Sequence, residues 1–286
     1  DWYTGAVTNM QSLFIYKANF NDDIGNWNMS NVQNASYMFN VAESFNQDLS
    51  NWDVSNVTNA AYMFNGAKAF QSDLSAWRMG KVTNFERMFA LCYDFNSELD
   101  DLDVGSATNM KGMFAQSSIN ADLNNWDVSN CTDFSNMFAS AGDFNGDLSS
   151  WDVRAATTMR YMFQGTPNFQ GDLSSWNVSS VNDMEGMFQY SAFDSDLPLW
   201  DVSAVTNMKS MFANSSFNGD IKNWNVASVT SMSNMFNADT LINADLSGWI
   251  VSSVNDMSSM FSGAQNFASD ISGWNVGAVT DMSGMF

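Results

Sequence analysis

The sequence predicts an α/β solenoid, a single stack of about 11–12 coils of 24–25 residues with one short parallel strand and one short helix in each coil. A Trp and a Met-Phe pair recur at this spacing along the whole chain. Within one coil, the apolar spacing changes from that of a strand to that of a helix. The recurring Trp residues are Trp2, Trp27, Trp52, Trp77, Trp126, Trp151, Trp176, Trp200, Trp224, Trp249 and Trp274, and Leu102 fills the one gap.

The predicted strand is the segment around each Trp. In the coil that contains Trp52, the residues Trp52, Asp53 and Val54 alternate apolar, polar and apolar. Successive side chains of a strand point to opposite faces, so Trp52 and Val54 would point into the core and Asp53 outward.

The predicted helix follows directly. Residues 55–59 are rich in Ser, Asn and Thr, which favour helix N-termini. Val57, Ala60, Met63 and Phe64 then fall on one face at helical spacing, and Gly66 stands where a helix end is expected. Gly165 and Gly263 occupy the same place in their coils.

Neither element is stable alone, because a two-turn helix and a three-residue strand bury too little surface. Stacking buries the Trp, Met and Phe columns in one shared core. Residues 1–286 therefore form a single continuous solenoid, with no separate capping domain visible.

The composition excludes several functions. Only 10 Lys and Arg stand against 31 Asp and Glu, a net charge of −21, which disfavours nucleic acid and anionic lipid. No apolar stretch is long enough for membrane insertion. The chain has no His, and no nucleophile can be paired with a base. We therefore expect that the protein is not an enzyme and that it needs no cofactor. Cys92 and Cys131 are expected to be free and apolar, with a disulfide as the alternative.

The repeated unit resembles a known family. Residues 45–59 read Phe-Asn-Gln-Asp-Leu-Ser-Asn-Trp-Asp-Val-Ser-Asn-Val-Thr-Asn, followed by Met63-Phe64. This unit is similar to the BspA-like leucine-rich repeat surface proteins, and to their Mycoplasma-type branch of unknown function in particular. The resemblance implies a leucine-rich-repeat-like solenoid outside the cell or on its surface, often in adhesins. It implies no catalytic residues.

The residue after each Trp is a candidate binding position on the exposed strand face. Solenoids commonly bind partners on such a face, although exposed Asn and Asp are often only solvated or bonded along the stack. The candidates are Asn28, Asp53, Asp103, Asp127, Asp152, Asn177, Asp201, Asn225 and Asn275.

An acid precedes the Leu or Ile of every coil. A column of like charges needs compensation, either by backbone N–H groups in turns or by calcium ions between coils. The less favoured calcium ladder would use Asp48, Asp73, Asp122, Asp147, Asp172 and Asp196.

Two further patterns have simple interpretations. The Trp, Met and Phe columns are expected to be core rather than sugar-stacking platforms, because they must fill the solenoid. Sequons for possible N-glycosylation arise from the repeated motif. They lie at Asn28, Asn34, Asn56, Asn130, Asn177 and Asn214.

These observations favour a non-enzymatic adhesion or binding scaffold at the cell surface, with a protein or glycan ligand. The alternative is a structural protein whose copies assemble end to end into an extracellular filament or coat. A calcium-stabilised solenoid is a third possibility.

Overall fold

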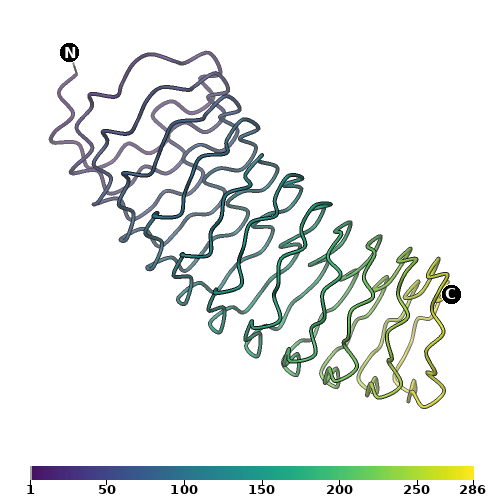
Figure 1. Ribbon diagram of the computed structural model, residues 1–286. Coiled ribbons are helices and arrows are strands. Elements are labelled where there is room, and N and C mark those ends of the chain that lie inside the picture. The colour runs from purple at the N-terminus through teal and green to yellow at the C-terminus, as the bar shows by residue number, and fades with distance from the viewer. Residues whose placement is uncertain (1) are drawn as a thin grey trace.

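The protein is one continuous stack of coils, with its two termini at opposite ends (Figure 1). The structure is a computed structural model, and it describes residues 2–286. Backbone hydrogen bonds join each coil to the next, as expected for a solenoid.

Residues 2–286 contain no helix and no extended strand. Regular pairing between coils is instead marked by one isolated parallel bridge per pair of coils, seven residues after the Trp position. The bridges join Asn9, Asn34, Asn59, Asn84, Asn109, Asp133, Thr158, Asp183, Asn207, Ser231, Asp256 and Asp281 in succession.

The eight residues that begin at each bridge form a continuous surface of hydrogen-bonded turns. We call this surface the turn ribbon. It comprises residues 9–16, 34–41, 59–66, 84–91, 109–116, 133–140, 158–165, 183–190, 207–214, 231–238 and 256–263.

The backbone of the ribbon is fully hydrogen-bonded, as the coil after Asn59 shows. The N–H groups of residues 60, 62, 64 and 66 donate to carbonyls of the next coil at 2.7–3.2 Å. Those of residues 63, 65 and 67 donate to the carbonyl three residues back, which closes tandem turns. The Asn59 side chain accepts the remaining N–H, that of Ala61, at 3.0 Å.

The predicted helix is therefore wrong. The third residues of the first and last of these tandem turns, Tyr62 and Gly66, have a positive φ of +58° and +72°, which fits type II turns and cannot continue an α-helix. Gly66, Gly165 and Gly263 are positive-φ turn residues and not helix ends. The apolar spacing at residues 57–64 is satisfied equally well by these turns, which is why periodicity alone predicted a helix.

The predicted strand is also misplaced. Trp52 and Val54 are buried and Asp53 is exposed, as alternation predicted. However, the parallel bridges lie at Asn34, Asn59 and Asn84, and none involves residues 52–54. Neighbouring coils pair along the turn ribbon instead, because four backbone N–H groups of each coil donate to carbonyls of the next coil there.

The core consists of stacked columns of aromatic and Met side chains. Trp52 lies over Trp77 with ring centroids 6.3 Å apart, and Phe39 lies over Phe64 at 5.4 Å. The Trp columns are buried from Trp52 to Trp274, whereas Trp2 is 78% exposed.

Each buried indole also bonds to the coil before it. The Trp77 Nε1–H donates to the Leu49 carbonyl at 3.0 Å, and the same bond recurs for every Trp from Trp52 to Trp274. Leu102 stands at a Trp position and has no such donor.

Three coils lack one residue after the ribbon, and a Ser side chain compensates in each. In a longer coil the N–H of Phe70 donates to the Ala67 carbonyl. In the short coils the corresponding N–H groups, those of Ile119, Phe193 and Phe217, donate to the hydroxyls of Ser117, Ser191 and Ser215. A hydroxyl thus replaces a turn carbonyl where the loop is shorter.

Candidate functional site

The predicted strand-face residues are exposed, apart from the partly buried Asp152, but their side chains are engaged locally. In each of the nine candidates, Oδ1 accepts the N–H of the residue two positions later at 2.9–3.3 Å, which forms an Asx turn. Hydrogen bonds from the following Ser lower the pKa of Asp53, Asp127 and Asp201, and the Arg154 side chain lowers that of Asp152. We call this surface the Asx face, and its role in binding stays a prediction.

The acid column before Leu or Ile also bonds to backbone. Asp48 and Asp73 each accept the N–H of a Ser two residues later at 2.9 Å, and this lowers the pKa of both carboxyls. Asp122, Asp147 and Asp172 make the same bond, and Asp196 accepts the N–H of Asp220 in the next coil. These bonds supply the backbone compensation that the sequence suggested.

The sequon amides differ in what they bind. The Nδ2 groups of Asn56 and Asn130 donate to carbonyls of the preceding coil at 2.8 and 2.9 Å, and that of Asn34 donates to Gln11. The Asn28 and Asn177 side chains accept bonds through Oδ1 in Asx turns. Asn214 is an exposed ribbon residue with φ +54°.

The sequence analysis missed a second inter-coil ladder of Asn side chains. The Asn46 Oδ1 accepts the N–H of Gln71 in the next coil at 2.9 Å, and Asn145 does the same for Gln170. The recurrence of Asn after each core Phe could have indicated this ladder, since Asn stacks are a known way to bond parallel coils.

The turn ribbon carries most of the tyrosines of the chain. Five of the seven Tyr residues lie on it, and all five have positive φ. They are Tyr16, Tyr37, Tyr62, Tyr161 and Tyr190. Four of the ten cationic residues also lie there, namely Arg87, Lys111, Arg160 and Lys209. The signal in the sequence was the unusual mixture of Gly, Asn and Tyr at two positions of the repeat.

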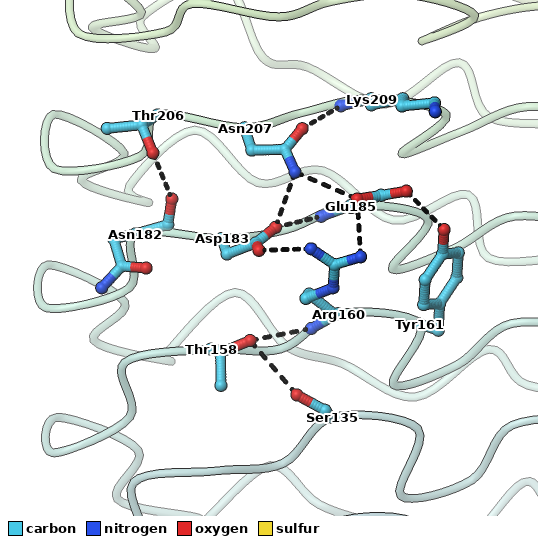
Figure 2. Close-up of polar contacts among 10 residues, drawn as sticks. All are labelled: Ser135, Thr158, Arg160, Tyr161, Asn182, Asp183, Glu185, Thr206, Asn207 and Lys209. Carbon is cyan, nitrogen blue, oxygen red and sulfur yellow. Dashed lines mark hydrogen bonds and ion pairs between the residues drawn. The ribbon is translucent and has the colours of Figure 1, made fainter.

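A polar cluster fixes one of these tyrosines on the ribbon (Figure 2). The Tyr161 hydroxyl donates to Glu185, and the Asn207 Nδ2 donates to Glu185 at 3.1 Å. Arg160 bridges Glu185 and Asp183, at 2.8 Å to each carboxylate. Burial opposes ionisation of Glu185, but these partners hold its pKa below the usual value. Burial and the Glu185 charge raise the pKa of Tyr161 to about 12.

The cysteines are free and buried, as expected. Burial raises the pKa of the Cys131 thiol to about 12, so the reactive thiolate is scarce at neutral pH. Within residues 2–286, no helix has the length and apolar character needed to cross a bilayer.

No curated protein matches the chain. A leucine-rich repeat protein from Bacteroides ovatus has a similar structure, with a TM-score of 0.46 and 8% identity over 92% of this chain and 69% of that one. The TLR13–ssRNA13 complex contains a chain with a TM-score of 0.33 and 10% identity, and the match covers 92% of this chain and 45% of that one.

The family comparison is more specific. The sequence profile described as "Mycoplasma protein of unknown function, DUF285" matches residues 1–102, 83–198 and 189–286. These three matches together span the whole chain and confirm the resemblance to the Mycoplasma-type repeat. The chain belongs to this family of Mycoplasma-type repeat proteins.

Proposed function

We propose that the protein is a non-enzymatic binding scaffold displayed outside the cell, and that the turn ribbon holds its protein or glycan partner. The repeat architecture and the family support a scaffold. The choice of face depends on which exposed positions differ from coil to coil.

The Asx face is nearly uniform along the stack. Its recurring Asn or Asp accepts a backbone N–H in the same way in nine coils. Turn geometry accounts for this uniformity without any ligand.

The ribbon is different, because its backbone is constant while its outward residues are not. The first positive-φ position holds Tyr, Arg, Gly, Asn or Ser in different coils. Gly and Asn suit a positive φ, whereas another L-residue costs about 1–2 kcal/mol there. Tyr37, Tyr62 and Tyr161 are only half-buried, so the core does not explain this cost.

The observation that carries the proposal is therefore the placement of five tyrosines at positive φ on one rigid surface. The turns require a positive φ in every coil, but they do not require Tyr there, and Val41, Leu91 and Gln116 stand at the same kind of position. Tyr offers a large contact area with little loss of side-chain freedom, which suits a binding surface.

A binding array of extracellular matrix proteins and glycans tests the proposal, with variants on each face. Tyr62→Asn and Tyr161→Asn remove the rings but keep a residue that tolerates positive φ. We expect the double variant to bind at least tenfold more weakly. Asp127→Lys and Asp152→Lys on the Asx face should leave binding within about twofold. Binding that is lost with the Asp variants and kept by the Tyr variants would place the site on the Asx face and contradict the proposal.

A further inference from the structure

At one junction of the stack, the two coils are joined firmly along the turn ribbon but weakly outside it. The junction lies between the coil of residues 73–97, which contains Trp77, and the coil of residues 98–121, which contains Leu102. We propose that the solenoid opens reversibly at this junction, with the turn ribbon as the hinge that keeps the two coils together. This proposal goes beyond the proposed function, because it concerns a motion of the stack and not its partner.

Two segments at the same positions of the repeat differ in their bonds to the coil before. They are residues 98–105, which we call the Leu102 arm, and residues 147–154, which we call the Trp151 arm. The turn inside each arm is the same, because the Leu102 N–H donates to the Leu99 carbonyl at 2.9 Å and the Trp151 N–H to the Leu148 carbonyl at 3.1 Å. The contrast between the arms lies in their contacts with the neighbouring coil.

The Trp151 arm is bonded to the coil before it at several points. The Trp151 indole donates to the Leu123 carbonyl at 2.8 Å. The N–H and the hydroxyl of Ser150 both donate to Asn124, the N–H at 2.8 Å. The Asn124 side chain donates in return to Asp147 at 3.0 Å. These bonds hold the two coils together outside the turn ribbon.

The Leu102 arm makes none of these bonds. Within residues 2–286, no hydrogen bond joins this arm to residues 73–80, which lie at the same positions of the coil before. The bonds that remain flank the arm, where the Ser97 and Ser106 hydroxyls donate to carbonyls of the coil before at 3.0 and 2.6 Å. The indole bond, by contrast, recurs in every other coil from Trp52 onward.

The column of stacked rings is interrupted at the same place. Trp52 lies over Trp77 and Trp126 lies over Trp151, in both cases with ring centroids 6.3 Å apart. Leu102 stands between these two pairs and is buried, but it has no ring to stack on either neighbour. Because stacked aromatic rings attract each other beyond the effect of the area that they bury, the core is less cohesive at this junction.

Asp100 adds a buried polar atom without a partner. Its Oδ1 is buried and accepts no hydrogen bond from any residue in the range 2–286. Ser stands at this position in six other coils, namely at Ser50, Ser75, Ser149, Ser174, Ser247 and Ser272. A buried carboxylate oxygen that lacks a donor is stabilised when water reaches it, so Asp100 favours an open junction over a closed one.

Charge repulsion acts in the same direction. Glu98, Asp101 and Asp103 stand beside Asp100 in the Leu102 arm. In the described part of the chain, none of these four acids forms a salt bridge with Lys or Arg. Arg78, the cation of the facing arm, donates instead to backbone carbonyls of its own coil. Closing the junction therefore brings acids together without a paired cation.

The turn ribbon stays closed at the same junction. The N–H groups of Phe85, Arg87, Phe89 and Leu91 donate to carbonyls of residues 109–115 at 2.8–2.9 Å. These bonds hold the two coils along one edge, so the arms can separate only as a wedge that opens away from the ribbon. Such a motion changes the angle between the two parts of the solenoid, and as a local opening it costs less than global unfolding.

Hydrogen–deuterium exchange of the full chain, resolved by peptide mass spectrometry, tests the proposal. After correction for intrinsic rates, we expect the amides of the Leu102 arm to exchange at least tenfold faster than those of the Trp151 arm. Ribbon residues 84–91 and 109–116 should be as protected as ribbon residues 133–140 and 158–165, within about threefold.

A reciprocal exchange of residues between the two arms provides matched variants. The double variant Asp100→Ser, Leu102→Trp restores the indole donor and removes the unpaired carboxylate, so it should slow exchange of the Leu102 arm at least tenfold. The double variant Ser149→Asp, Trp151→Leu should accelerate exchange of the Trp151 arm by a similar factor and leave the Leu102 arm unchanged. Because the variants alter different arms, a folding defect in one leaves the test with the other.

Two results would overturn the proposal. The first is equal protection of the two arms in the wild-type protein. The second is exchange of ribbon residues 84–91 as fast as that of the Leu102 arm, because whole coils would then detach and the ribbon would not act as a hinge. Fast exchange that is confined to the Leu102 arm, and that the Asp100→Ser, Leu102→Trp variant removes, is the result that the proposal predicts.

Discussion

At the scale of single residues, side chains supply many of the bonds that join one coil to the next. The indole of Trp151 donates to the Leu123 carbonyl at 2.8 Å while its ring fills the core. The Leu123 carbonyl also accepts the backbone N–H of Trp126 at 3.1 Å, which closes a turn within that coil. The indole bond therefore adds inter-coil contact to a carbonyl that already closes a turn.

We predict that Trp151→Phe lowers the free energy of unfolding by about 1–2 kcal/mol, because it removes this buried bond and part of the ring stack. Urea unfolding followed by circular dichroism measures the change. Trp2→Phe is the matched control, since Trp2 is 78% exposed, and it should be neutral. Equal effects from the two variants would show that the indole bond does not contribute.

Asp239 is a carboxylate with no exposed surface. One of its oxygens accepts the N–H groups of Leu241 and Ile242 at 3.1 and 3.2 Å. The other accepts the Ser215 hydroxyl at 2.9 Å and the Phe217 N–H at 3.1 Å from the preceding coil. Burial nevertheless prevails over these bonds and raises the pKa of Asp239 to about 6.

This pKa predicts how stability depends on pH. Below pH 3.8 both the folded and the unfolded chain hold the proton, so the contribution of Asp239 is fully present. Between pH 3.8 and about 6 the unfolded chain releases the proton first, and stability falls by an amount on the order of 3 kcal/mol. Carboxyls with lowered pKa values, such as those of Asp48 and Asp73, act in the opposite direction. The stability that they contribute to the fold is lost only as the pH falls.

Melting temperatures of the wild type and Asp239→Asn between pH 4.5 and pH 7 isolate this group. The wild type should lose stability relative to the variant as the pH rises. A constant difference between the two proteins across that range would mean that Asp239 titrates at an ordinary pKa.

At the scale of the elements, the ribbon depends on positive φ and on close packing between turns. Gly186 has φ +61°, and the Tyr161 ring occupies the space that a side chain would need. We predict that Gly186→Ala lowers the free energy of unfolding by about 2 kcal/mol or more, through backbone strain and displacement of the ring.

The matched control for this variant is Gly142→Ala. No atom lies within 4 Å of the added Cβ at Gly142, and its φ is not positive. The control should change stability by less than about 0.5 kcal/mol in the same chemical denaturation experiment. A destabilised control with an unaffected Gly186→Ala would contradict the turn geometry of the ribbon.

The shortened loops are a second feature at this scale. The Ser117 hydroxyl donates to the Phe114 carbonyl at 2.8 Å and accepts the N–H of Ile119. Ser117→Ala should therefore cost about 1–2 kcal/mol in thermal or urea unfolding, because a buried N–H loses its acceptor. Ala67→Ser, in a coil with the longer loop, should cost less, because the Phe70 N–H keeps its carbonyl partner. The reverse order would show that Ser does not compensate for the deletion.

At the scale of the whole molecule, the sequence predicted those features of the fold that depend only on the spacing of the repeat. The coil length, the single continuous core and the inward direction of Trp52 and Val54 follow from spacing alone. The outward position of Asp53 follows from the same alternation. The expectation of free, apolar Cys92 and Cys131 rested on the usual behaviour of such cysteines, and both are free and buried.

The path of the backbone between core residues could not be predicted in the same way. Residues 57–64 place the same side chains inward as a helix or as tandem turns, so their pattern does not distinguish the two. The choice depends on hydrogen bonds to the next coil, such as Tyr62 N–H to the Glu86 carbonyl at 2.7 Å, which local propensity does not include. The ribbon was missed for this reason, since the positive φ at Tyr62 and Tyr161 arises only when that stretch is not helical.

The turn ribbon is thus the central claim, and far-UV circular dichroism of the folded protein tests it most directly. The spectrum should lack the double minimum of an α-helix while near-UV signals from the stacked Trp and Tyr rings are present. A helical double minimum that melts together with the near-UV signal would contradict the ribbon and every role given to its tyrosines.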